Sequence, residues 1–365
     1  MSTSFGWVRN LWLREGVIDS PKGVTLFSLS LPNLPSEYRR TMPDTVASTN
    51  SRPDLVLLES LVDEVEVVFH GKRDVIRLAL AALLARGHIL FEDVPGVGKT
   101  TLAHALARSL GLTFRRIQFT SDLLPSDVLG VSLFNLRTSE FETRPGPIFT
   151  NILLADEINR APPRTQSGLL QAMQEGMVTI DDKTFQLPAP FLVLATQNPL
   201  EHHGTYPLPE SQLDRFLMRL TIGYPDEEAE RRILIESSRL EELLNRIRAV
   251  LLPSQILDLQ AQVDRVRADA SLIDLLQEIV GRTRVDSRLQ IGVSPRGAVA
   301  LFKAARAYAM VQGRTFLAPD DILTMAVPCL AHRLLPVGTA ASTAEAHQEA
   351  AVILEEIIQE VPVPV

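Results

Sequence analysis

The chain has 365 residues, of which 45% are hydrophobic and 22% are charged. This composition lies outside the disordered range, and the length suits about two globular domains. The net charge of -8 argues against a protein whose main task is to coat nucleic acid. A single cysteine, Cys329, excludes an internal disulfide, so we expect a reducing compartment, the cytoplasm. No apolar stretch reaches the roughly 18 residues of a membrane-spanning helix, and the first residues lack the pattern of a secretory signal.

The chain begins with a segment, 1–53, that is rich in Ser, Pro and Thr and shows no apolar period. We expect it to be a poorly ordered extension, for which Met42 would be an alternative start. Apolar residues at helical spacing then predict two helices, at 55–69 and 73–84.

Short apolar runs follow, separated by helical patterns. The predicted strands are 88–91, 114–119, 152–155, 191–195 and 218–222, with a helix at 100–110 after the first of them. Such an alternation predicts an α/β domain with a parallel sheet covered by helices on both faces, here spanning 54–224. From 225 to 365 the pattern is helical with no convincing strand, which predicts a second, smaller, all-helical domain.

A glycine-rich loop lies between the first predicted strand and the helix at 100–110. In such a context its backbone N–H groups and the helix N-terminus cradle phosphate oxygens. Lys99 is expected on the β- and γ-phosphates, and the Thr100 hydroxyl on Mg²⁺. The predicted phosphate-binding residues are Pro95, Gly96, Val97, Gly98, Lys99, Thr100 and Thr101.

One position of this loop departs from the usual pattern, because Asp93 stands where a glycine is common. We expect its side chain to point away from the nucleotide, since a carboxylate there would repel phosphate. Pro95 and Gly96 would then supply the tight turn.

The apolar run at 152–155 ends in two carboxylates, Asp156 and Glu157. Adjacent residues at a strand end point in different directions, so they suit different tasks. We expect Asp156 to hold the Mg²⁺ shell, and Glu157 to polarise the attacking water as a general base. Without the phosphate loop, the same pair could be an ordinary solvated strand end.

Three further polar residues are candidates for catalysis. Asn198 follows a strand expected beside the acidic one, where it would orient the water, although it could simply begin a turn. An added arginine accelerates phosphoryl transfer by roughly 10³–10⁵-fold. Arg215 lies at the edge of the nucleotide domain and would reach a neighbouring subunit, whereas Arg296 would contact the nucleotide from the second domain. The weaker rivals for the first role are Arg160, Arg164 and Arg219.

Several motifs together resemble the MoxR-type AAA+ ATPases, over roughly residues 55 to 360. The matching runs are 87–100, 116–120, 123–127, 156–161, 173–176, 195–199 and 213–216. The resemblance implies the AAA+ P-loop fold with a helical lid, with Asn198 as first sensor, Arg215 as finger and Arg296 as second sensor. It also implies that an Asp at position 93 is common.

The resemblance also makes structural expectations about two shorter segments. It implies a hairpin inserted within a helix around 173–188, and the residues at 178–180 and 184–187 fit its two strands. Gly71 and Lys72 stand where the family usually has Gly-Gln, which leaves the adenine contacts there unassigned.

Such ATPases are hexameric rings that use ATP and Mg²⁺. The resemblance implies a chaperone-like remodeller of protein clients, often in the maturation of metal- or cofactor-containing enzymes, with a von Willebrand factor A domain protein as partner. One alternative is the ATPase subunit of a magnesium- or cobalt-chelatase. Another is a nucleic-acid motor, which is disfavoured because the predicted hairpin carries Glu175, Asp181 and Asp182 against Lys183. A nucleotide-binding scaffold without turnover is disfavoured by Glu157.

Overall fold

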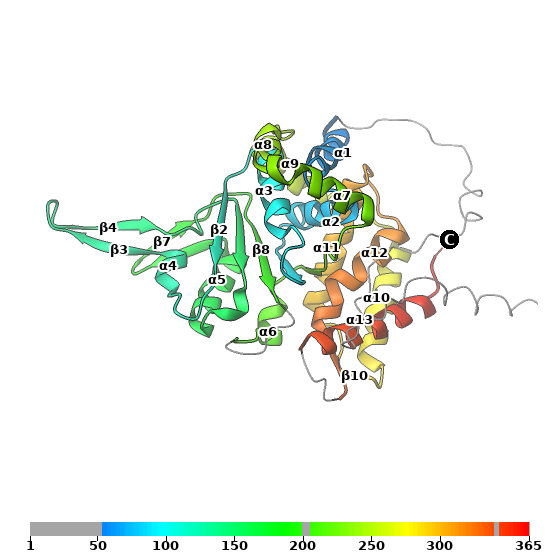
Figure 1. The fold of residues 1–365 in the computed structure, drawn as a ribbon. Coiled ribbons are helices and arrows are strands. Elements are labelled where there is room, and N and C mark those ends of the chain that lie inside the picture. Colours follow the sequence, from blue (N-terminus) through cyan, green and yellow to red (C-terminus); the bar gives the residue numbers. More distant parts are fainter. Residues whose placement is uncertain (1–52, 199–204, 339–342, 365) are drawn as a thin grey trace, which may run out of the picture. The chain divides into compact units, whose positions relative to one another are not determined.

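The computed structural model describes residues 53–198, 205–338 and 343–364 (Figure 1). The predicted N-terminal extension, 1–53, lies outside the described residues except for its last one. No helix of the described residues is long and apolar enough to cross a membrane. The boundary expected near residue 224 stays a prediction.

A five-stranded parallel sheet forms the centre of the α/β region, in the order β2-β5-β8-β1-β9. All five strands were predicted, with ends that differ by one or two residues. Residues in β1, β5 and β8 are buried almost throughout, as expected for parallel strands covered on both faces. The strands are β1 (Ile89–Glu92), β2 (Phe114–Gln118), β5 (Ile152–Asp156), β8 (Leu192–Gln197) and β9 (Met218–Leu220).

Alternate residues of each central strand enter two separate hydrophobic clusters. In β5, Ile152 and Leu154 belong to the larger cluster, while Leu153 and Ala155 belong to the smaller one. This alternation follows from the two-residue period of a strand. The larger cluster includes residues of α1 (Pro53–Glu66), α2 (Arg73–Leu84) and α3 (Lys99–Ser109), and the smaller one includes residues of α5 (Pro163–Glu175).

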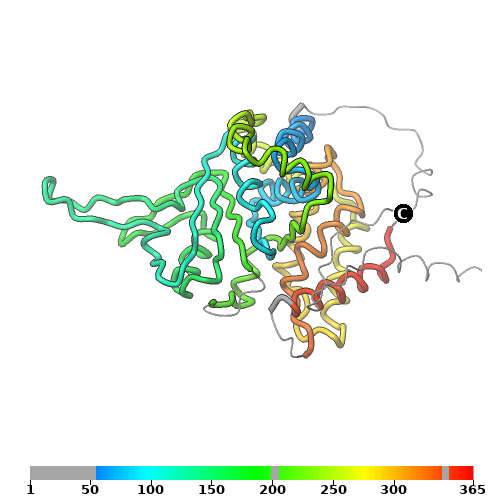
Figure 2. Tube along the Cα trace, viewed as in Figure 1, coloured from blue at the N-terminus to red at the C-terminus, as the bar shows by residue number. Residues whose placement is uncertain are grey.

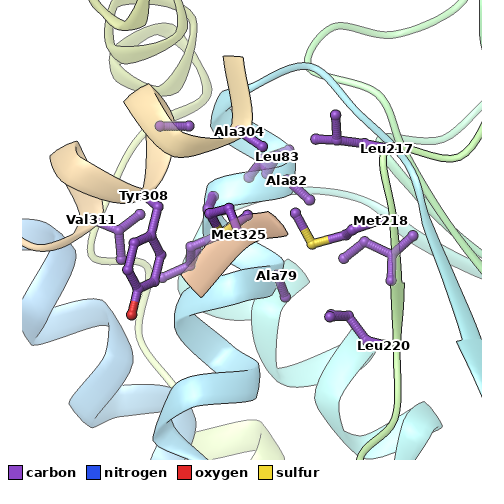
Figure 3. Packing of buried hydrophobic residues seen from close by; sticks show 14 of the residues in the cluster. Ala79, Ala82, Leu83, Leu217, Met218, Leu220, Ala304, Tyr308, Val311 and Met325 are labelled. Carbon is purple, nitrogen blue, oxygen red and sulfur yellow. The ribbon is translucent and has the colours of Figure 1, made fainter. Parts of the chain in front are cut away.

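Helix α2 packs between the edge of the sheet and the C-terminal helices. Figure 3 shows Ala79 and Ala82 of α2 among Met218 of β9, Tyr308 of α11 (Pro295–Val311) and Met325 of α12 (Pro319–Leu330), all of them buried. The small alanine side chains let these elements approach closely. The C-terminal helices therefore share one core with the sheet.

A buried histidine joins three elements of the sheet region. The backbone N–H of Val193 donates to His88 Nδ1 at 3.0 Å, so the ring proton lies on Nε2, which donates to the Met173 carbonyl at 3.0 Å. Burial lowers the pKa of His88 to about 4, because the charged ring would lose its hydration. His88 is thus a neutral connector between the start of β1, β8 and α5.

Two hairpins leave the central sheet. The sequence did not predict the first, β3 (Gly130–Asn135) with β4 (Glu140–Pro145), which follows the short helix α4 (Pro125–Leu129). Figure 2 shows this hairpin as a long projection of the trace. The rings of Phe134 and Phe141 contact edge to face at 5.2 Å, although both side chains are more than half exposed.

The second hairpin corrects one expectation. Strands β6 (Met177–Ile180) and β7 (Lys183–Gln186) form the predicted pair, but they follow α5 instead of interrupting a helix. Helix α5 stops at Gly176, whose φ of 65° is left-handed. After β7, Pro188 and Pro190 do not permit a helix, and the chain enters β8 directly.

The C-terminal region is mainly helical, as predicted, but not entirely. Strands β10 (Leu289–Ile291) and β11 (Leu335–Pro336) form a small antiparallel pair, which corrects the all-helical expectation. They are too short to show a period, and one contains a proline. The helices after the sheet strand β9 are α7 (Glu227–Glu236), α8 (Leu240–Arg246), α9 (Pro253–Val263), α10 (Ala270–Val285), α11 (Pro295–Val311), α12 (Pro319–Leu330) and α13 (Thr343–Glu360).

Candidate nucleotide-hydrolysis site

The glycine loop joins the end of β1 to the start of α3. Gly96 and Gly98 have φ values of 88° and 92°, a left-handed region that favours glycine. A Cβ on Gly98 would also lie 3.1 Å from the Phe69 ring, so a side chain there would push that ring aside. Helix α3 begins at Lys99 without a side-chain cap, which leaves its first N–H groups available to an anion.

Lys99 is held beside this loop. Its Nζ donates to the carbonyls of Asp93 at 2.9 Å and Val94 at 3.1 Å. Burial lowers the pKa of Lys99, while the carboxylates of Asp93, Asp156 and Glu157 act in the opposite direction. The cation of the loop therefore lies within electrostatic range of Asp156, the predicted Mg²⁺ ligand, and Glu157, the predicted base.

The side chain of Asp93 points away from the loop, as expected. Its Oδ2 accepts hydrogen bonds from the backbone N–H groups of Ile222 at 2.6 Å and Gly223 at 2.8 Å, and its Oδ1 accepts one from Val94 at 2.8 Å. The residue is only 5% exposed. Asp93 thus anchors the loop to the chain that follows β9 and does not face a phosphate.

The two acids at the end of β5 are tied to the neighbouring strand by one hydroxyl. Thr196 of β8 donates to Asp156 Oδ1 at 2.6 Å and accepts from the Glu157 backbone N–H at 2.8 Å. Glu157 has a left-handed backbone with φ 55° and ψ 50°, which ends the strand at this point. That the two acids serve different tasks stays a prediction.

Strand β2 contributes two residues that sequence reasoning missed. Arg116 donates to Asp156 Oδ2 at 2.6 Å and 3.1 Å, and Gln118 donates to Glu157 Oε2 at 2.7 Å. Arg160 also forms an ion pair with Glu157 Oε2 at 2.9 Å. The carboxylate of Glu157 is therefore held by two partners. Arg116 and Gln118 could have been found from the pairing of Gln118 with Asp156 in the parallel ladder. That pairing is known only once the order of the strands is known.

Asn198 lies directly after β8, between the ends of β5 and β1, and is 9% exposed. The expected neighbourhood with the acidic strand is confirmed by the pairing of β5 with β8. An amide at this edge is well placed to hydrogen-bond a water.

The donor set fits Mg²⁺ in its usual mode with nucleotides. Thr100 lies in the first turn of α3, and Asp156, whose side chain is 15% exposed, ends β5. In the described part of the chain, no group of three or more His, Cys, Asp or Glu could hold a metal by itself. Mg²⁺ typically binds through one or two protein oxygens, substrate phosphates and waters, so few protein ligands are needed.

Arg215 and Arg296, the two predicted catalytic arginines, make no recorded contact with Asp156 or Glu157 in the described residues. Arg215, after the short helix α6 (Glu210–Leu213), is half-buried, and its side chain makes no hydrogen bond or ion pair within the described residues. Arg296, in the first turn of α11, pairs with Asp214 at 3.4 Å and is 53% exposed. Arg296 thus contacts the residue that precedes Arg215 in the chain.

The rivals for the finger role have other surroundings. Arg160 pairs with Glu157 of its own chain, and Arg219 forms an ion pair with the buried Glu92. Arg164 is exposed at the start of α5.

Comparison with known proteins agrees with this arrangement. The model of the ATPase family associated with various cellular activities (AAA) matches residues 88–218, and the AAA lid domain model matches residues 281–357. Together with the phosphate loop and the strand order, these matches define an AAA+ ATPase.

Individual relatives specify the family further. Uncharacterized protein YeaC of Bacillus subtilis is 53% identical over 311 residues, covering 85% of this chain and 95% of that protein. Chaperone MoxR1 of Mycobacterium tuberculosis is 42% identical over 287 residues, covering 76% of this chain and 75% of that protein. The crystal structure of a proposed ATPase from Cytophaga hutchinsonii matches with a TM-score of 0.78 and 37% identity, covering 86% of this chain and 97% of that one. The chain belongs to the MoxR-type AAA+ ATPases.

Proposed function

We propose that this protein hydrolyses ATP to ADP and phosphate at the carboxyl edge of the sheet, with Lys99 on the terminal phosphates and Glu157 as the general base. The observation that carries this proposal is the convergence of Lys99, Asp156 and Glu157, with Thr196 tying the two acids together. A phosphate loop alone would serve a binding protein equally well. The adjacent carboxylate supplies the group that activates water.

The residues divide the work according to their positions. The N–H groups of residues 95–101 and the start of α3 bind the phosphates, and Lys99 leaves the carbonyls of Asp93 and Val94 to reach them. Thr100 and Asp156 would hold Mg²⁺, which neutralises charge on the phosphates when it is bound. Glu157 must exchange Gln118 and Arg160 for the attacking water, which Asn198 orients.

We further propose a ring, most simply a hexamer, in which Arg215 completes the site of the next subunit and Arg296 contacts the nucleotide of its own chain. In support, the Arg215 side chain has no partner among the described residues of its own chain. A guanidinium that is half-buried and unpaired is suited to a group that enters from another subunit.

The work of the ring, on this proposal, is chaperone-like remodelling of a protein client in the cytoplasm, in the maturation or metal and cofactor loading of an enzyme. A von Willebrand factor A domain protein would be its partner. The name of the relative MoxR1, a chaperone, supports this class of work. We do not propose a nucleic-acid substrate, because Asp181 and Asp182 occupy the turn of the β6–β7 hairpin. Residues 54–224 would form the nucleotide-binding domain and 225–365 the lid.

Lys99→Ala tests the site most directly. Its removal takes away the fixed cation of the phosphate loop, so binding of a fluorescent ATP analogue and magnesium-dependent phosphate release should both disappear. Lys183→Ala, in the turn region of the β6–β7 hairpin, is the matched control and should bind normally. Normal nucleotide affinity in the Lys99 variant would refute the assignment of the loop.

A further inference from the structure

The segment that carries Arg215 is held by one buried arginine of the C-terminal region. Arg333 lies in the short helical turn η4 (Ala331–Arg333) after α12, and its side chain is 4% exposed. It forms an ion pair with the Asp214 side chain, and it donates to the Asp214 carbonyl at 3.1 Å and to the Phe216 carbonyl at 2.7 Å. The two carbonyls belong to the residues on either side of Arg215.

Further contacts make this connection rigid. Arg333 Nε donates to the Cys329 carbonyl at 2.8 Å, which fixes the guanidinium to the end of α12. His332 Nε2 lies 3.2 Å from the same Phe216 carbonyl. Burial lowers the pKa of Arg333, and the charge of Asp214 opposes that effect. A guanidinium this deeply buried depends on its partners, so movement of η4 must move the segment with it.

The same aspartate also contacts the arginine proposed to sit on the nucleotide. Asp214 Oδ2 pairs with Arg296 at 3.4 Å, while Asp214 Oδ1 pairs with Arg333. Arg296 is half exposed, so this contact is weak and easily exchanged for another anion, such as a phosphate. Asp214 therefore joins a residue of one nucleotide site to the segment that serves the next.

We propose that Asp214 and Arg333 are positioning residues for the Arg215 finger, so that the lid of each subunit sets how well that subunit activates its neighbour. The proposal rests on the proposed function, in which Arg215 acts in the adjacent site. When a bound nucleotide takes Arg296 away from Asp214, Asp214 keeps only its ion pair with Arg333. The Arg215 segment then moves together with the lid. A contact that merely stabilised the fold would instead affect the site of its own subunit.

Mixed assemblies of the full-length protein separate these two cases. Glu157→Gln subunits offer a finger but do not hydrolyse, and Arg215→Ala subunits have a complete site but offer no finger. Mixing them should restore phosphate release at Arg215→Ala sites that border a Glu157→Gln subunit. The decisive subunits are Arg333→Gln alone and Arg333→Gln combined with Glu157→Gln.

The proposal expects Arg333→Gln subunits to gain activity when they are mixed with Glu157→Gln subunits, since their own sites are intact. It expects the double variant to restore Arg215→Ala subunits about tenfold less well than Glu157→Gln does. The reason is that a catalytic group misplaced by ~1 Å can lower the rate by as much as ~10²-fold. Equal restoration by the double variant, or no gain in Arg333→Gln subunits, would overturn it. If Glu157→Gln itself fails to restore Arg215→Ala, the trans finger of the proposed function is the part that fails.

Two further variants keep the result interpretable. Arg314→Gln breaks a comparable lid ion pair, in which Arg314 bonds both oxygens of Asp321 at 2.7 Å and 2.5 Å, away from Asp214. Combined with Glu157→Gln, it should restore Arg215→Ala fully. Asp214→Asn removes the ion pair from the other side and takes the place of Arg333→Gln if light scattering shows that the latter does not assemble. The same two outcomes then support or overturn the proposal.

Discussion

Two strands of the sheet end in the same way in the sequence and differently in the structure. The apolar strand β1 ends in Glu92 and Asp93, and the apolar strand β5 ends in Asp156 and Glu157. The first pair is about 5% exposed and satisfied entirely within the chain: Glu92 by Arg219 and His347, and Asp93 by backbone N–H groups.

The second pair is more open, and its partners can be exchanged. The side chain of Asp156 is 15% exposed and that of Glu157 is 27% exposed, and Arg116, at 49%, provides a contact that solvent weakens. An apolar strand that ends in two acids is therefore not sufficient to indicate catalysis. The neighbouring strands differ: β9 offers Glu92 a largely buried cation, whereas β2 offers Glu157 an amide close to solvent.

The largest effect should come from Glu157→Gln. The variant keeps the shape of the side chain but removes the base, so phosphate release should fall by about 10²–10⁴-fold while ATP still binds. Phosphate release and nucleotide affinity, measured on the same preparation, check this. Retained turnover would show that Glu157 is not the base. The contrast between the ends of β1 and β5 would then lose its functional meaning.

Glu92→Gln should show the opposite behaviour. It leaves Arg219 with a buried charge and no counter-ion, which typically costs about 3–5 kcal/mol in the free energy of unfolding. Hydrolysis per folded subunit should stay within a few-fold of the unaltered protein at low temperature. Urea unfolding monitored by circular dichroism measures the first quantity. A variant as stable as the parent would show that the buried acid is not structural.

Thr196→Val should have an intermediate effect on turnover. The change preserves volume but leaves the Glu157 backbone N–H without its acceptor and frees Asp156. The cost of about 1–3 kcal/mol corresponds to a fall of about 5- to 150-fold in rate if it is borne by the transition state. Thr179→Val, which removes an exposed threonine–threonine hydrogen bond in the β6–β7 hairpin, is the matched control. Equal rates in the two variants would argue against Thr196 as the tie between the acids.

The smallest effect concerns acid. Burial alone would raise the pKa of Glu92. The hydrogen bond from His347 and the charge of Arg219 outweigh burial and lower this pKa from 4.5 to about 2. A carboxylate with a lowered pKa stabilises the fold above its unfolded value and loses that contribution as the pH falls from 4.5 towards about 2. Glu92→Gln should therefore reduce the slope of stability against pH in this window by up to about 1.4 kcal/mol per pH unit. Parallel curves for the two proteins would contradict the shift.

The sequence predicted the parts of this molecule that leave a long or chemically specific pattern. Apolar runs gave all five sheet strands, and the loop around Gly98 gave the phosphate site. The β3–β4 hairpin was missed because its turn, with Ser139 at φ 56°, has no Asn-Gly or Asp-Gly signature. Strands β10 and β11 were too short to show a period.

The site was only partly predictable for a related reason. Lys99, Asp156 and Glu157 lie in local motifs, but Arg116, Gln118 and Thr196 reach the acids across neighbouring strands. Their contacts depend on the order β2-β5-β8, which no local pattern specifies. The outward turn of Asp93 was expected from electrostatics alone, whereas its backbone partners after β9 required the fold.

The projecting β3–β4 hairpin has a consequence for handling the protein at high concentration. It is a two-stranded sheet in the described structure, so an outer row of backbone N–H and C=O groups faces away from its own partner strand. Rows of this kind recruit further strands and seed aggregates. Strand β4 carries Glu140, Glu142 and Arg144, and two such strands paired in parallel and in register would set like charges side by side. We expect low pH or high salt, which weakens that repulsion, to favour association through this hairpin.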